Sequence, residues 1–274
     1  MIMKRGEVLL LLLTAALLVL TACSPKDIQP FEGRLLFQVK ESYRQMTEGV
    51  EPSIYLSMET EKIYECFNYS IVADLLRTNA LLMLDIKGIE RPAICLTALG
   101  PAVGGRFLEL GEGVYSLEFR CGSARRSVYE LAVTGEAITI AESSGAQGTI
   151  TVPQFTLWWR YPENSFAVIC GTTVETDWVF EDFLGRLQAG LDLVPYEFPP
   201  VGEIGYPRES QGHHVNHPSR FFLYGEDGDF VAAGEILREY VRDVIGGMTG
   251  VNIWLLNWKN ESFRSWMMGS ESPE

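Results

Sequence analysis

The stretch from Val114 to Ile140 alternates apolar and polar side chains, and this limits the fold that the first half of the chain can adopt. Apolar residues occupy every second position from Tyr115 to Phe119 and again from Tyr129 to Val133. Because successive side chains of a strand point to opposite faces, a period of two is typical of a strand buried on one face. The glycines at 122 and 135 interrupt the pattern as turn residues do. The stretch therefore predicts consecutive half-buried strands.

Further short apolar segments with turn signals between them fill residues 33–144, and Gly100, Gly104 and Gly105 look like turn glycines. Many short strands of this kind are typical of a β-sandwich. In general pattern the last of them resemble the final strands of an immunoglobulin-like domain. We therefore expect an immunoglobulin-like β-sandwich in residues 33–144. The expected strands are Leu35–Lys40, Ser53–Met58, Ile63–Val72, Ala80–Ile86, Ala93–Leu96, Arg106–Leu110, Val114–Arg120, Ser127–Val133 and Ala137–Ala141.

The spacing of the apolar residues changes after a glycine-containing joint at residues 145–148. Apolar residues at a spacing of three to four predict one helix from Trp178 to Leu191, with Trp178 on its apolar face and Thr176 or Asp177 as its cap. A second helix is expected from Asp229, as its cap, to Val244. With strands before, between and after these helices, the order from Phe166 is β-α-β-β-α-β, the order of ferredoxin-like folds. We expect an α+β domain over residues 149–268 and a disordered tail over residues 269–274.

The first 23 residues carry an export pattern. Lys4 and Arg5 precede an apolar run from Val8 to Leu20, and small residues lead to Cys23. The tetrapeptide Leu20-Thr21-Ala22-Cys23 resembles the lipobox of bacterial lipoproteins. The resemblance implies a signal peptide over residues 1–22, a diacylglyceryl group and further acyl chain such as palmitate on Cys23, and a lipidated tether over residues 23–32. The apolar run is shorter than the roughly 20 residues that a membrane-spanning helix needs.

The same resemblance implies a lipid-anchored place in the bacterial cell envelope. Ser24 stands where many lipoproteins retained at the inner membrane have an aspartate, which favours the outer membrane in a cell with two membranes. The formal net charge of the whole chain is -14. This excess of acidic groups argues against nucleic-acid partners, whose binding proteins carry basic stripes.

Four cysteines follow Cys23: Cys66, Cys95, Cys121 and Cys170. An exported protein meets oxidising conditions, and four cysteines allow three pairings. We expect Cys66 to pair with Cys95, because both lie in the same predicted sheet region. Cys121 and Cys170 pair with each other across the domains or stay free and buried.

All three histidines fall in one short segment, at His213, His214 and His217. Imidazole groups bind zinc and other divalent metals, so three in one loop are a candidate metal site, with or without catalysis. The alternative is an exposed polar loop, since no His-Glu-x-x-His spacing is present.

Six tryptophans lie in the second half of the chain: Trp158, Trp159, Trp178, Trp254, Trp258 and Trp266. Exposed indole rings can stack on sugar rings or on partner side chains, and buried ones simply fill a core. Trp158 and Trp159 are adjacent, so in a strand they point to opposite faces.

No serine-nucleophile elbow and no phosphate-binding loop is present. The sequence therefore favours a non-catalytic binding or assembly module of the envelope, with a protein or glycan partner. A metal-binding protein or metal-dependent enzyme using the three histidines is one alternative, and a carbohydrate-binding lipoprotein is another.

Overall fold

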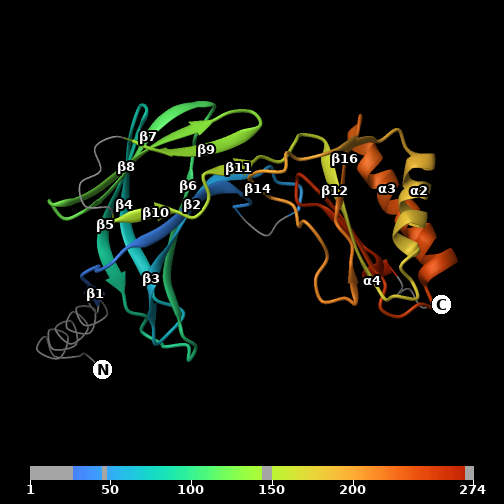
Figure 1. Cartoon of the computed structure of the whole chain (residues 1–274), viewed down its shortest axis with the longest axis horizontal. Helices are drawn as coiled ribbons and strands as arrows, with labels where there is room; N and C mark the ends of the chain where they lie inside the picture. Colours follow the sequence, from blue (N-terminus) through green and yellow to red (C-terminus); the bar gives the residue numbers. More distant parts are fainter. Residues whose placement is uncertain (1–26, 45–47, 144–149, 269–274) are drawn as a thin grey trace, which may run out of the picture.

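The computed structural model describes residues 27–44, 48–143 and 150–268, and the fold is mostly β-strand, at 47%. The strands form a twelve-stranded sheet and a six-stranded sheet (Figure 1). The predicted signal peptide, Cys23, the joint at residues 145–148 and the predicted tail at residues 269–274 lie outside the described residues. Among the residues that are described, no helix has the length and apolar character needed to cross a membrane.

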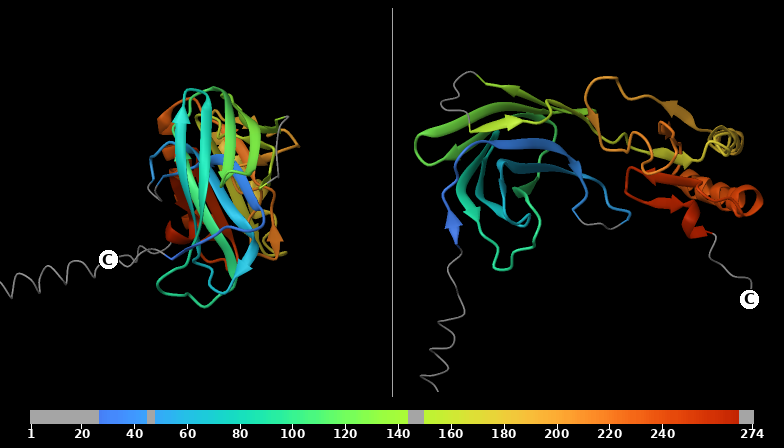
Figure 2. Two further views of the ribbon diagram at one scale, coloured as in Figure 1. Left: turned by 90° about the vertical axis from the view of Figure 1, so that its left-hand side faces the viewer. Right: turned by 60° about the horizontal axis from the view of Figure 1, so that its bottom comes forward.

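The first sheet is one continuous hydrogen-bonded path in the order β10-β2-β3-β6-β4-β5-β7-β8-β9-β11-β14, with β1 attached to β5. A β-sandwich has two separate sheets, whereas this single sheet curls into a half-barrel (Figure 2). Its strands are β1 (Ile28–Gln29), β2 (Leu35–Ser42), β3 (Ser53–Tyr64), β4 (Ser70–Thr78), β5 (Leu81–Glu90), β6 (Gly100–Leu108), β7 (Gly113–Cys121), β8 (Arg125–Val133), β9 (Ala137–Glu142), β10 (Thr151–Pro153), β11 (Leu157–Trp159) and β14 (Glu203–Ile204).

The curl brings two walls of the first sheet face to face around a single core. Phe37 of β2 packs on Phe119 of β7 and on Tyr129 of β8, at ring-centroid distances of 4.7 and 4.9 Å. The hydroxyl of Tyr129 donates a hydrogen bond of 2.6 Å to the carbonyl of Thr151 in β10, which itself pairs with β2. The apolar residues of the alternating pattern thus lie on the inner face of this curl, where their burial stabilises the fold.

The predicted tether is partly folded. Ile28–Gln29 forms β1 against β5, and Phe31 is buried in the core. Gly88 in β5 permits this close approach, because a Cβ atom there would lie 2.2 Å from the carbonyl oxygen of Gln29. The predicted lipidated tether over residues 23–32 thus includes Ile28 and Gln29, which pair with β5, and Phe31, which packs in the core.

The second sheet has the order β13-β16-β12-β17-β18, with β15 on β12, and all its pairings are antiparallel. Helices α2 and α3 lie side by side against one face of it (Figure 1). The elements are β12 (Ser165–Thr172), α2 (Val179–Gly190), β13 (Val194–Tyr196), β15 (Val215–Asn216), β16 (Arg220–Leu223), α3 (Asp227–Tyr240), the π-helical turn η1 (Val241–Ile245), β17 (Asn252–Asn257), β18 (Ser262–Arg264) and α4 (Ser265–Met268).

The helix starts differ from the prediction. Trp178 precedes the first residue of α2 and is 48% exposed, so its expected place on the apolar face was wrong. Phe180, Phe183 and Leu187 supply the buried face instead. Asp229 lies inside the first turn of α3, where its carboxylate accepts hydrogen bonds from the backbone N–H groups of Gly225 and Glu226. It stabilises the helix start as the inner member of a capping box.

Residues 150–161 join the two sheets. Strand β10 pairs with β2, and β11 pairs with β9 on one side and with β14 on the other. Next to β11, the buried carboxylate of Glu41 accepts a 2.8 Å hydrogen bond from Nε of Arg160 and a 2.7 Å bond from the backbone N–H of Tyr161. Burial raises the pKa of Glu41, and its two hydrogen bonds and the Arg160 charge oppose that shift.

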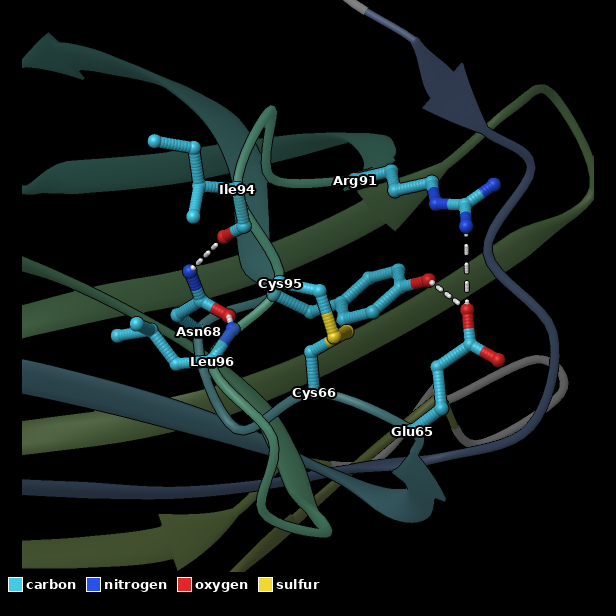
Figure 3. The surroundings of a disulfide bond; sticks show 8 residues. Glu65, Cys66, Asn68, Arg91, Ile94, Cys95 and Leu96 are labelled. Carbon is cyan, nitrogen blue, oxygen red and sulfur yellow. Dashed lines mark hydrogen bonds and ion pairs between the residues drawn. A yellow bond between two sulfur atoms is a disulfide. The ribbon is translucent and has the colours of Figure 1, made fainter.

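The expected Cys66–Cys95 disulfide is present (Figure 3). It links the turn between β3 and β4 to the connection between β5 and β6. Within the described residues, Cys121 is a partly buried free thiol and Cys170 a buried one.

Replacing both bridged cysteines, as Cys66→Ser/Cys95→Ser, will lower the free energy of unfolding by about 3.5 kcal/mol, because a bridge across 29 residues restricts the unfolded chain. Urea unfolding followed by circular dichroism measures this loss. Cys121→Ser is the matched control and should leave the midpoint unchanged. Equal stability of the bridged and unbridged chains would contradict the prediction.

Replacing Arg160 with Met will destabilise the protein by about 3 kcal/mol at pH 7.5, because the Glu41 carboxylate stays buried without its cation. The pKa of Glu41 then lies still further above its value in the unfolded chain. The folded state gains a proton as the pH falls through that raised pKa, so the destabilisation is largest above it and shrinks towards pH 5.

The control is Glu41→Gln/Arg160→Met, which removes both charges and should lose this pH dependence. Urea midpoints at pH 7.5 and pH 5 measure the effect. The same loss of stability at both pH values in Arg160→Met would rule out the carboxylate as its cause.

Candidate functional site

Helices cover one face of the second sheet, and a loop covers only part of the other face. Side chains alternate between the two faces, so Val168 and Ile253 point to the helices while Ile169 and Trp254 point away. Ile204 of β14 and Tyr206 of the loop between β14 and β15 pack against one end of this second face. The other end remains open as a cleft of about 450 Å³.

The cleft combines aromatic and polar side chains. Two indole rings, an imidazole, two amides and a carboxylate line it: Trp254, Trp266, His213, Asn252, Gln211 and Glu209. A volume of this size suits a small ligand or one to two rings of a larger one. We call this the tryptophan cleft.

The aromatic wall of the tryptophan cleft is rigid on one side and exposed on the other. Trp254 lies in β17 and is partly buried, whereas Trp266 lies in α4 and is 51% exposed. The guanidinium of Arg264 lies 5.1 Å from the ring centroid of Trp254 and 5.7 Å from that of Trp266. The cation thus lies within interaction distance of both rings, and Trp266 stays half exposed.

The polar wall is held by a short hydrogen-bond network. The Asn252 amide lies 3.0 Å from Nε2 of His213, and the His213 ring lies over Gly171 of β12. A Cβ atom on Gly171 would come within 2.1 Å of that ring, so glycine is required for the ring to lie there. The side-chain oxygen of Asn216 accepts hydrogen bonds from Ser210 and from the backbone of His213, which fixes the loop.

Two donors in this region have no acceptor among the described residues. The indole nitrogen of Trp254 and Nε of Arg264 are both buried and unpaired. A buried donor without a partner costs free energy.

The three histidines do not converge. His213 lines the cleft and His214 is exposed. His217 lies 2.9 Å from the hydroxyl of Thr172 and 3.4 Å from a carboxylate oxygen of Asp177, and its ring packs on Phe180. Within the described part of the chain, no group of three or more His, Cys, Asp or Glu side chains is placed to hold a metal ion.

The other four tryptophans do not line the cleft. Trp158 packs on the core of the first sheet, and Trp159 on the loop-covered face of the second, as their adjacent positions predict. The buried Trp258 donates its N–H to the hydroxyl of Tyr224. Trp178 is exposed away from the cleft, so Trp254 and Trp266 are the pair that the fold brings together.

The buried thiol of Cys170 stays protonated at neutral pH. Burial raises its pKa to about 12, and the nearby Asp177 carboxylate adds to the shift. The thiolate is the nucleophilic form, so this cysteine is not a nucleophile at neutral pH.

The sequence pointed to the tryptophans and to His213 but missed Asn252, Gln211 and Glu209. Asn252 stands two residues before Trp254 in an apolar strand, so the two share a face, and that spacing could have identified it. The residues 209–211 are placed by the path of the loop, for which the sequence offers no signal.

No family model, no curated protein and no solved structure matches this chain.

Proposed function

We propose that this protein is a lipid-anchored, glycan-binding protein of the bacterial cell envelope and that the tryptophan cleft takes the glycan. The observation that carries this proposal is the pairing of Trp254 and Trp266 beside hydrogen-bonding side chains in one cleft. A pyranose ring has an apolar face of C–H groups, which packs on indole, and a rim of hydroxyl groups, which bond to amides and carboxylates.

The ligand is an uncharged glycan. The chain carries a net charge of -14, and Glu209 lies in the cleft wall. An anionic polysaccharide would meet repulsion from both. Asn252, Gln211 and His213 can each donate and accept hydrogen bonds, as hydroxyl groups require.

The anchor part of the proposal depends on the leader and the tetrapeptide ending in Cys23. Two or more acyl chains hold a protein stably on a bilayer, so the folded part needs no spanning segment. The cleft would then stay close to the membrane, at a raised local concentration towards any glycan there.

The finer fold assignments are part of the proposal. A ferredoxin-like second domain is supported by the element order β12-α2-β13-β16-α3-β17 with both helices on one face. An immunoglobulin-like relation of the first domain is supported by the two walls that enclose one core.

Replacing Trp266 with Ala will raise the Kd for a neutral oligosaccharide at least tenfold, about 1.4 kcal/mol, because the exposed stacking face is lost. The probes are cellotetraose, N-acetylated chitotetraose and maltotetraose, measured by indole fluorescence and by calorimetry. Trp178→Ala is the matched control, since Trp178 is exposed to nearly the same fraction (48% against 51%) but lies outside the cleft. No binding of any of the three sugars at millimolar concentration would overturn the glycan proposal.

Cells fed an alkyne-labelled fatty acid will label the wild-type chain, and Cys23→Ser will remove the label, because the thiol of Cys23 is the attachment point. A second variant combines Cys23→Ser with an ordinary secretory leader in place of residues 1–22, and it should appear in the soluble fraction. Mass spectrometry of the native N-terminal peptide is the decisive measurement. An unmodified residue 23, or a retained leader, would refute the anchor.

A further inference from the structure

In the connection from β5 to β6, Arg91 is followed by an exposed loop of uncharged residues, where the predicted strand Ala93–Leu96 is not formed. Its residues are Pro92-Ala93-Ile94-Cys95-Leu96-Thr97-Ala98-Leu99, and all but Pro92 are exposed. Thr97 is its single hydrogen-bonding side chain. Ile94 and Leu99 are 76% and 77% exposed, and Phe67 of the neighbouring turn is 49% exposed. We call residues 92–99 the apolar loop.

The apolar loop is held in this exposed form. The disulfide fixes its middle to Cys66, and the side chain of Asn68 bonds to both sides of that point (Figure 3). The Asn68 amide donates to the carbonyl of Ile94 at 2.8 Å, and its oxygen accepts from the backbone N–H of Leu96 at 3.2 Å. A covalent bond and two hydrogen bonds thus keep these apolar side chains in contact with solvent. Exposed apolar patches of this kind mark interaction sites.

The start of the described chain lies beside the apolar loop. The backbone N–H of Arg91, one residue before the loop, donates a 3.0 Å hydrogen bond to the carbonyl of Asp27. Strand β1 pairs with the end of β5, with Ile28 opposite Glu90. Strand β1 and the connection after β5 both lie at the lower end of the first sheet (Figures 1 and 2).

The short stretch of chain between Cys23 and Asp27 indicates which surface the apolar loop faces. Cys23 precedes Asp27 by four residues, and four residues span at most about 14 Å. A lipid on Cys23 would therefore hold Asp27, and with it the apolar loop, close to the bilayer surface. The loop has no charge to desolvate, and exposed apolar side chains gain free energy on leaving water.

From this placement we infer that the apolar loop and Phe67 dock into the lipid surface beside the anchor. The inference rests on the proposed lipid on Cys23 for the position of the loop. The loop is a second contact that fixes the orientation of the first sheet on the membrane. A single flexible lipid attachment leaves that orientation free, whereas two contacts define it.

A fluorescent probe of polarity placed at residue 97 tests the inference. The lipidated full-length mature chain, with Cys121→Ser and Thr97→Cys, is labelled with NBD and reconstituted into neutral phosphatidylcholine–phosphatidylethanolamine vesicles. NBD emission at residue 97 should shift to the blue and be quenched at least twofold by nitroxide on the lipid acyl chains. Val114→Cys, in the same Cys121→Ser chain, is the matched control, because Val114 is 59% exposed in β7 and distant from β1.

Emission from residue 97 that matches the aqueous emission from residue 114 would overturn the inference. So would an unchanged signal after Ile94→Asp/Leu99→Asp, which should return the probe at residue 97 to water. Mass spectrometry of Cys23 separates the two proposals. If Cys23 carries no lipid, the anchor fails, and the labelled chains are remade with Cys23→Ser, so that NBD stays off residue 23, and mixed with vesicles at millimolar lipid. Quenching at residue 97 would then support docking, and its absence would refute it.

Discussion

The placement of both sheets depends on the segment from Ile150 to Tyr161. Its first part pairs with β2 and accepts a hydrogen bond from the hydroxyl of Tyr129 across the core. Its second part pairs with β9. It ends where Glu41 accepts the hydrogen bonds of Arg160 and Tyr161. One stretch thus closes the curl of the first sheet and leads into β12, which begins the second sheet at Ser165. A buried carboxylate with a cation and an amide is costly to leave half paired, which gives this junction a single favourable geometry.

The sequence predicted the elements better than their connections. Both helices, the strand before them and the strand after them were found, because the 3.6-residue period and the long apolar runs are local properties. Ile63–Val72 was expected as one strand, but β3 ends at Tyr64 and β4 begins at Ser70, because the disulfide and Asn68 form a turn between them. Gly104 and Gly105 looked like turn residues and lie inside β6. A Cβ atom on Gly105 would come within 2.0 Å of the Tyr55 hydroxyl, a close approach that only the pairing with β3 creates.

The candidate site was predictable only in part for the same reason. Trp254 and His213 are separated by about forty residues and meet because His213 lies over Gly171, in the strand next to β17. Clustering along the sequence suggested instead that the three histidines act together, but the loop turns them towards a cleft, solvent and a helix. The tryptophan cleft and the apolar loop lie on different sheets. A protein that is held on the membrane at the apolar loop and binds its ligand in the tryptophan cleft would present that ligand at a fixed height above the lipid.

The disulfide joins neighbours in the order of the chain. Under the proposed export the thiol of Cys23 is consumed by lipid, and a chain that crosses a membrane amino terminus first then presents Cys66 and Cys95 before the remaining cysteines. Oxidation in the order of arrival gives the native bond directly, with no reshuffling step. Cys170 arrives last and enters a site where its sulfur holds its proton, which removes it from exchange. Maturation of this protein would thus need an oxidant to form its Cys66–Cys95 bond.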